Sequence, residues 1–349
     1  LRISQHPINI AEAFAYRKES KFPLNLVGAQ KRRILDKEYP YQFMELSRDL
    51  QDKIVAKETS KLPITDFPVN KNLEDKSGVI VVHEKPIDKP EWGMYYASID
   101  PVSEGKTTTS ESLCSIYIYK NPVEVKRVKN GDVENFIEHD KIVCWWTGRF
   151  DDITKTHERL LMMIEWYNAW TIVENNVSLF IGYMINMNKQ KYLVPKDQIM
   201  FLKDLGANQN VYQAYGWKNT GTLFKTNMLS YLIEFLKEEI DRETKEDGTI
   251  VKVTYGIERI PDIMAMIEME QYDGDINVDR IVALGALIAF AKVQQANRGF
   301  KKRVEYMDRK DLQKSNNIVK LHNSPFRHIG KGPSVNGSKP PRNPFKNIR

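Results

Sequence analysis

Two acidic residues each follow directly on an apolar, strand-like stretch of this sequence. Asp100 ends "MYYASID" at residues 94–100, and Glu174 ends "TIVE" at residues 171–174. A buried charge is unfavourable unless it is paired or binds a cation. Taken alone, Asp100 has an ordinary structural interpretation, since an Asp before Pro101 favours the start of a turn. Taken together, the two acids suggest chemistry that needs a pair of close carboxylates.

A third acid stands at the start of the most apolar helix that the sequence predicts. Asp279 precedes "RIVALGALIAFA" in a helix expected over residues 278–295. An acid at a helix N-terminus also has a simpler explanation, because the helix dipole stabilises it there. Asp273 and Asp275 come shortly before Asp279 in the sequence, and either could take its place as the third acid of a metal site.

The pairing of the predicted strands decides whether the first two acids meet. If strands 94–99 and 170–174 are parallel neighbours, their ends lie about 5 Å apart, at the edge where open α/β sheets bind ligands. Asp100 and Glu174 would then repel each other, and a divalent cation would relieve this. Oxygen ligands without a His or Cys cluster suit Mg²⁺ or Mn²⁺ better than zinc. Such sites suit two-metal phosphodiester hydrolysis, in which one metal activates water and the other stabilises the leaving 3′ oxygen.

The apolar patterns predict an α/β fold with a mixed sheet flanked by helices. Strand-like runs at 94–99, 113–119 and 141–146 have no long helical pattern between them, which favours an antiparallel meander. Apolar residues at helical spacing indicate further helices. These helices are expected within 151–170, 177–189, 222–241 and 278–295, with Asp152 or Thr154 capping the first and a turn at Asp247-Gly248.

Composition divides the 349-residue chain into three expected regions. Residues 1–88 are polar and interrupted by prolines, so we expect a linker region with a few small elements, including a strand at 78–85. Residues 89–297 are expected to form the main domain, and 298–349 a basic, flexible tail. From residue 301 onward the net charge is +10, whereas the whole chain is +6. Such tails contact nucleic acid or acidic proteins, or are simply solvated.

Several classes of protein do not fit the sequence. The start has no signal-peptide pattern, and the longest apolar run, at 281–291, is too short to span a bilayer. Cys114 and Cys144 lie in strand-like runs without metal-ligand spacing, which fits a reducing, intracellular setting. No phosphate-binding GxxxxGK[ST] loop occurs, so this chain by itself is not expected to act as an ATP-driven motor. A nucleotide-binding domain is also disfavoured, because the turn after Asp100 has one glycine where several are needed.

Four stretches, in order, resemble the nuclease domain of tailed-bacteriophage terminase large subunits. They are "YYASIDP", "TIVENN", "YGWKNTGTLFKTNMLSYLIEFL" and "NVDRIVALGALIAFAK", within a region of about 90–297, and "QHPINIAEAF" upstream resembles the segment that closes the motor domain. The resemblance implies an RNase H-like fold and a metal-dependent endonuclease that cuts concatemeric viral double-stranded DNA during genome packaging. It matches Asp100, Glu174 and Asp279 to the family's three catalytic, metal-binding acids.

The resemblance also implies a set of partners and a location. The partners are the ATPase motor domain of the same longer polypeptide, the portal protein and the small terminase subunit, in the cytoplasm of an infected bacterial host. A packaging nuclease contacts DNA mainly through phosphates, and four basic residues are candidates for this: Lys106, Lys218, Lys225 and Arg280. One departure from the family is that many members carry two adjacent acids at the third position, where Val278 precedes Asp279 here.

Two other functions stay open at this point. The chain could be another RNase H-like enzyme, such as a recombinase or resolvase, although those usually carry a separate DNA-recognition module and no helix-turn-helix or zinc pattern occurs here. It could instead be a catalytically silent module that docks on DNA or on the portal. The presence of all three acids argues against the silent module.

Overall fold

The computed structural model describes most of the chain from residue 20 to residue 307. The described residues are 20–69, 73, 75–102, 112–129, 132–176, 179–199, 214–217, 222–245, 247–273, 278–298 and 301–307. The chain divides into two compact units, one of residues 1–124 and 137–303 and the other of residues 125–136 and 304–349. None of the helices in the described ranges has the length and apolar character that a bilayer crossing requires.

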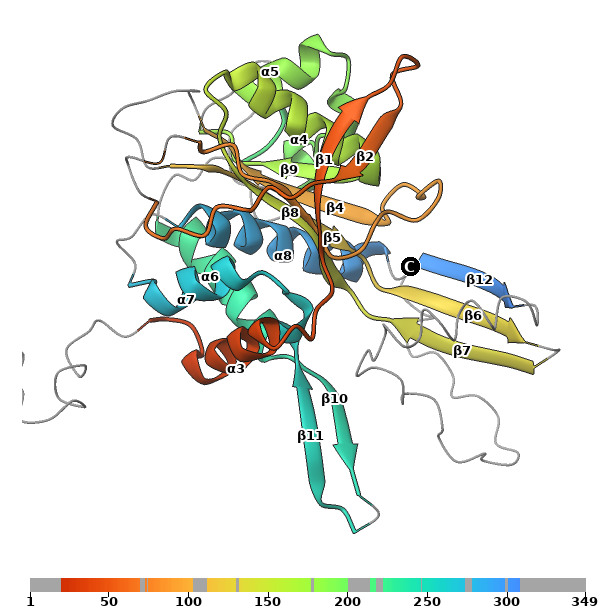
Figure 1. Ribbon diagram of the computed structural model, residues 1–349. Coiled ribbons are helices and arrows are strands. Elements are labelled where there is room, and N and C mark those ends of the chain that lie inside the picture. Colours follow the sequence, from red (N-terminus) through yellow and green to blue (C-terminus); the bar gives the residue numbers. More distant parts are fainter. Residues whose placement is uncertain are drawn as a thin grey trace, which may run out of the picture. The chain divides into compact units, whose positions relative to one another are not determined.

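A mixed seven-stranded sheet lies at the centre of the larger unit (Figure 1). Its strands are β1 (Gln42–Arg48), β2 (Ile54–Glu58), β3 (Ile80–Val82), β4 (Tyr95–Asp100), β5 (Cys114–Lys120), β8 (Lys141–Gly148) and β9 (Trp170–Val173). Across the sheet they follow the order β2-β1-β3-β8-β5-β4-β9. Neighbouring strands are antiparallel, except that β9 runs parallel to β4. The sheet therefore combines an antiparallel meander with one parallel pair at its end.

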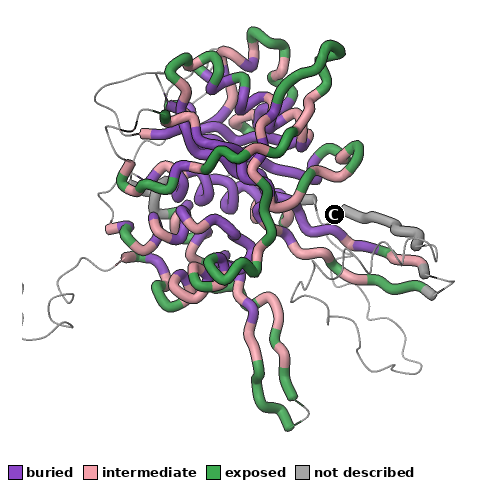
Figure 2. Tube along the Cα trace, viewed as in Figure 1, coloured by how far each residue is buried: buried purple, intermediate pink, exposed green. Residues whose placement is uncertain are grey.

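The central strands are buried on both faces, which explains their nearly continuous apolar sequences. Every residue of β5 is buried, and in β4 only Asp100 is not. Sheets covered on both faces need such unbroken apolar runs. Figure 2 shows the buried residues concentrated in these strands and in the helix next to them. The strands expected at 94–99, 113–119 and 141–146 are confirmed as the antiparallel set β4, β5 and β8.

Helices cover both faces of the sheet. They are α3 (Leu24–Leu35), α4 (Ile153–Tyr167), α5 (Leu179–Asn186), α6 (Thr222–Lys237), α7 (Ile263–Gln271) and α8 (Asp279–Arg298). Helix α8 packs along β4 and β5, with α6, α7 and α3 on the same side, whereas α4 and α5 lie on the other side (Figure 1). Leu284, Leu287 and Ile288 are fully buried, in agreement with the prediction that this helix is apolar almost all round.

The ends of two helices settle points that the sequence left open. Asp152, rather than Thr154, caps α4, because its side chain accepts a hydrogen bond of 2.9 Å from the Thr154 backbone N–H. The helix expected over 222–241 ends at Lys237, and the chain continues as β10 (Glu239–Thr244), paired with β11 (Ile250–Tyr255). The turn at Asp247-Gly248 is therefore confirmed, and strand pairing overrides the helical spacing after residue 237.

The described part of residues 1–88 is more structured than the expected linker. Beyond α3, it supplies β1, β2 and β3, which belong to the same sheet as β4. The expected strand at 78–85 is confirmed as the shorter β3. The described part of the chain before residue 88 is therefore a structural part of the main fold. The tail expected to be flexible over 298–349 is partly structured, because Arg298 ends α8 and β12 (Lys301–Met307) is paired in a sheet. The rest of the tail, beyond residue 307, lies outside the described residues.

A second, separate sheet contains three strands in the order β12-β6-β7. These strands are β6 (Val123–Lys129), β7 (Asp132–Glu138) and β12 (Lys301–Met307). Within the smaller unit, the Arg127 guanidinium lies 4.6 Å from the centre of the Phe136 ring, which links β6 to β7. Three short 3₁₀ helices, η1 (Gln190–Tyr192), η2 (Lys196–Gln198) and η5 (Gly256–Arg259), complete the described elements of the larger unit.

Candidate active site at the carboxyl ends of β4 and β9

The parallel pairing of β4 with β9 places Asp100 and Glu174 at the same edge of the sheet. In this pairing Ile99 lies opposite Val173, so each acid comes directly after a paired residue. The Glu174 backbone N–H donates to the Ile99 carbonyl oxygen at 2.9 Å. Parallel strands present their carboxyl ends together, where open α/β sheets bind ligands. The predicted neighbourhood of these two strands is therefore confirmed.

Asp279 reaches the same edge from the first turn of α8. Its Oδ2 accepts a hydrogen bond of 2.8 Å from the Leu113 backbone N–H, just before β5 begins. Because α8 packs along β4 and β5, its N-terminus is held against the end of the sheet. Asp100 and Asp279 each keep part of their surface exposed, whereas Glu174 is buried.

Electrostatics show that the three acids act on one another. Burial raises the pKa of Asp100 well above its ordinary value, and the negative charges of Glu174 and Asp279 and a hydrogen bond to Glu174 raise it further. Burial and the charges of Asp100 and Asp279 also raise the pKa of the Cys114 thiol, which stays protonated. The structure thus brings the three acids that the sequence singled out into a single acidic cluster.

Glu174 is held in place by the short segment 214–217. Trp217 forms a parallel bridge with Glu174, and its backbone N–H donates to the Val173 carbonyl oxygen at 2.9 Å. Gly216 has a φ of +70°, and a Cβ atom there would lie 2.4 Å from the same Val173 oxygen. Only glycine fits this close approach without strain. The Asn176 side-chain amide donates to Glu174 Oε1 at 2.5 Å, which fixes the carboxylate itself.

Glu268, on α7, holds the start of α8 and so the position of Asp279. Its Oε2 accepts from the backbone N–H groups of Arg280 and Ile281, at 3.2 and 3.3 Å, in the manner of a helix cap. Its Oε1 accepts from Arg280 Nη1 at 2.7 Å, and both side chains are almost completely buried. Burial outweighs the nearby Arg280 charge and raises the pKa of Glu268 to about 7. Sequence reasoning missed this residue, whose signal was a glutamate inside the apolar helix "IMAMIEMEQ".

Arg280 does not take the role that its place beside Asp279 suggested. It was expected to contact DNA phosphates, but it is 3% exposed, paired with Glu268, and donates to the Ile64 carbonyl oxygen at 3.2 Å. Its charge is used inside the protein. Of the other predicted residues, Lys106, Lys218 and Asp275 lie outside the described residues, as does the side chain of Lys225 in α6. Asp273 follows α7 and is partly exposed.

The acidic cluster has the ligand types that a metal ion needs, but not the arrangement. No group of three or more His, Cys, Asp or Glu side chains, among the residues that the structure describes, is arranged to hold a metal ion as it lies. The types of ligand do fit, since three carboxylates offer the hard oxygen atoms that Mg²⁺ and Mn²⁺ prefer. Their mutual repulsion, seen in the raised pKa of Asp100, is the condition that a divalent cation would relieve. Asp100, Glu174 and Asp279 are therefore the residues that could hold such an ion.

Comparisons with known proteins found no matching family model, no matching curated protein and no matching solved structure.

Proposed function

We propose that this chain is a metal-dependent endonuclease with an RNase H-like domain, of the kind found in phage terminase large subunits. The observation that carries the proposal is the cluster of Asp100, Glu174 and Asp279, contributed by two parallel strand ends and a helix start. The antiparallel run β8-β5-β4, with β9 parallel on the far side of β4, supports the RNase H-like assignment. The sequence resemblance supplies the substrate class, which is concatemeric viral double-stranded DNA.

In this proposal the protein's own residues build a rigid, negatively charged edge. When bound there, Mg²⁺ or Mn²⁺ would activate water and stabilise the leaving oxygen of the phosphodiester. Asp100, Glu174 and Asp279 would be the residues that hold the metal. Burial and the neighbouring negative charges favour the protonated form of Asp100 in the absence of metal, whereas a metal ligand must be ionised. Metal binding should therefore be coupled to proton release.

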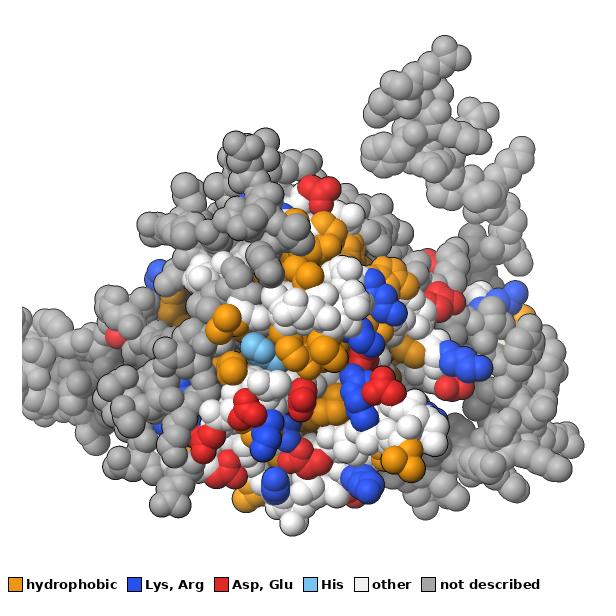
Figure 3. All heavy atoms as spheres, turned by 90° about the horizontal axis from the view of Figure 1, so that it is seen from above, with side chains coloured by type: hydrophobic (Ala, Val, Ile, Leu, Met, Phe, Trp, Pro, Cys, Tyr) orange, Lys and Arg blue, Asp and Glu red, His pale blue; other side chains and the backbone are white. Residues whose placement is uncertain are grey.

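Lys106, Lys218 and Lys225 remain the proposed phosphate contacts, without Arg280. The face that carries α4, α5 and β1 is a less suitable DNA surface, because Figure 3 shows acidic and basic side chains interspersed there. Ion pairs join Glu165 on α4 to Arg48 on β1 and to Lys189, which follows α5. The proposal also includes a motor domain in the same longer polypeptide, contacts with the portal and the small subunit, and action in the host cytoplasm.

Plasmid cleavage tests the proposal. The full chain is incubated with supercoiled plasmid and Mn²⁺, Mg²⁺ or EDTA, beside Asp100→Asn and the control Asp66→Asn, which changes an exposed aspartate outside the cluster. We expect metal-dependent nicking and linearisation by the unchanged protein and by the control, and none by Asp100→Asn. Cleavage by Asp100→Asn at the unchanged rate would refute the role of the cluster.

A catalytically silent docking module is the second candidate. The observation that favours it is that the described acids, as they lie, do not form a metal-holding arrangement. Absence of cleavage with either metal, together with DNA binding that no cluster variant alters, would favour this second function.

A further inference from the structure

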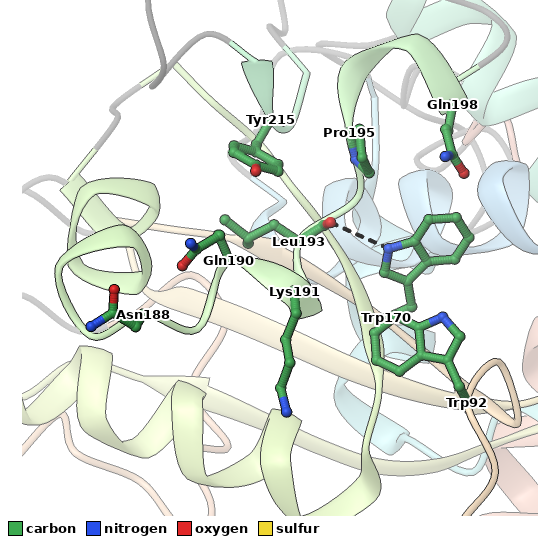
Figure 4. A pocket seen from close by; sticks show the side chains of 9 residues that line it. All are labelled: Trp92, Trp170, Asn188, Gln190, Lys191, Leu193, Pro195, Gln198 and Tyr215. Carbon is green, nitrogen blue, oxygen red and sulfur yellow. Dashed lines mark hydrogen bonds between the residues drawn. The ribbon is translucent and has the colours of Figure 1, made fainter.

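A pocket beside β9 is separate from the acidic cluster and has a different chemical character. It has a volume of about 480 Å³, within the range of sites that hold small ligands. Trp92, just before β4, and Trp170, at the start of β9, lie together on one side of it (Figure 4). Asn188 and Gln190, from the segment after α5, lie on the other side (Figure 4).

The aromatic side of this pocket is fixed in position and open to a ligand. Trp170 is 4% exposed, and its indole N–H donates to the Leu193 carbonyl oxygen at 3.2 Å. Trp92 is 38% exposed, with its ring centre 6.2 Å from that of Trp170 and 6.0 Å from that of Tyr192. Two neighbours therefore support Trp92 while it keeps exposed surface. An exposed tryptophan held in this way can stack on a flat ring.

The polar groups of the pocket suit the edge of such a ring. Asn188, Gln190 and Gln198 contribute carboxamides, each of which can both donate and accept hydrogen bonds. Lys191 adds a positive charge, and among the described residues that line the pocket none is acidic. A flat ring with donors and acceptors on its edge, attached to a negatively charged chain, satisfies all of these features. A nucleobase on a phosphate backbone is a ligand of this kind.

The pocket is connected to the acidic cluster through two short stretches of backbone. Tyr215 lines the pocket, and two residues later Trp217 bridges to Glu174. The side-chain amide of Asn175 donates to the Tyr215 carbonyl oxygen at 3.0 Å. Along β9, Trp170 precedes Glu174 by four residues, a span of about 13 Å at the usual strand rise. The rise of about 3.4 Å per nucleotide of one strand holds along a duplex axis, and an unpaired strand is more extended, so this span corresponds to a few nucleotides at most.

We propose that this pocket holds an unpaired nucleobase of a DNA strand whose backbone lies across the acidic cluster. The inference rests on the proposed nuclease function and adds a substrate feature to it, namely a single-stranded or frayed segment within a few nucleotides of the cut. Stacking on Trp92 supplies the affinity, and the carboxamides read the edge of the base. Lys191 lies where it can contact a neighbouring phosphate.

The test compares two DNA ligands that differ only in their bases. Fluorescence anisotropy, in EDTA so that nothing is cut, measures binding of the full chain to a duplex with a short single-stranded overhang. The second ligand carries abasic sites along the overhang, so that the phosphate charges are unchanged. We expect the overhang with bases to bind about tenfold more tightly, as stacking of one base on an aromatic side chain gives.

Three variants assign this difference to the pocket. Trp92→Ala should abolish the preference for bases, and Trp92→Phe, which keeps a flat ring, should retain most of it. Trp166→Ala is the matched control, because Trp166 is a partly exposed tryptophan on α4 outside the pocket; it should bind like the unchanged protein. Equal binding of both overhangs by the unchanged protein would overturn the inference. So would a preference that survives in Trp92→Ala, or Trp92-dependent binding of a neutral oligosaccharide in place of the base.

The outcome is independent of the cleavage test. Base preference without plasmid cleavage would support the pocket and count against the nuclease. Cleavage without base preference would support the nuclease and overturn the pocket.

Discussion

Replacement of Gly216 by alanine should show how tightly the segment beside Glu174 is packed. The residue has a φ of +70°, and the new Cβ would lie 2.4 Å from the Val173 carbonyl oxygen. A left-handed conformation costs an alanine about 1–2 kcal/mol, and overpacking of a tight site costs about 1–3 kcal/mol more. Relief of the clash would move the oxygen that accepts from the Trp217 N–H. We therefore expect Gly216→Ala to lower the free energy of unfolding by about 2–5 kcal/mol.

Two other glycines provide matched controls for this variant in thermal unfolding. Gly248, in the turn between β10 and β11, has a φ of +83° with nothing within 4 Å of its added Cβ; Gly248→Ala should cost the conformational part alone. Gly28 lies in α3 with open space around it, so Gly28→Ala should be neutral or slightly stabilising, because alanine favours helices. The reasoning is refuted if Gly216→Ala and Gly248→Ala melt at the same temperature.

Three further predictions concern the buried charges. Arg280→Met leaves Glu268 buried without its partner, so the free energy of unfolding in denaturant should fall by about 3–5 kcal/mol; a loss below about 1 kcal/mol would contradict the buried pair. Burial lowers the pKa of His157 from 6.5 to about 4, so the unfolded chain binds a proton that the folded chain does not. The free energy of unfolding is therefore unaffected by this group above pH 6.5 and decreases as the pH falls towards 4, by at most about 3 kcal/mol. Thermal melting of His157→Phe should lack this part of the pH dependence. In EDTA at pH 7, Asp100→Asn should melt above the unchanged protein, because the raised pKa of Asp100 reflects burial and repulsion; equal or lower melting would contradict the repulsion.

The central strands could be predicted because burial on both faces leaves a strong sequence signal. β4, β5 and β8 are apolar nearly throughout. The acid at the end of each apolar run made the parallel pairing of β4 with β9 a hypothesis, which the structure confirms. β1 and β2 were missed because they lie at the other end of the sheet, where most of their residues are only partly buried or exposed. Such strands need few apolar residues, so their sequences resemble a charged linker.

The acids of the site could be found from the sequence, but their support could not. Asp100, Glu174 and Asp279 each stand at the end of an apolar element, a position that local pattern reveals. The pairing of Glu268 with Arg280 depends on how α7 packs against α8, which no local pattern encodes. Arg280 was for this reason interpreted as a surface base, whereas packing turns it inward. Gly216 is a similar case, since its need for glycine comes from the distant Val173.

The most direct test of the central claim is a calorimetric titration of Mn²⁺ into the full chain and its cluster variants. The claim is that Asp100, Glu174 and Asp279 act together on a divalent cation. We predict saturable binding with proton release by the unchanged protein and by Asp66→Asn, and severely weakened binding by Asp100→Asn, Glu174→Gln and Asp279→Asn. Saturable binding of unchanged affinity in all three cluster variants, or no binding by the unchanged protein, would contradict the account.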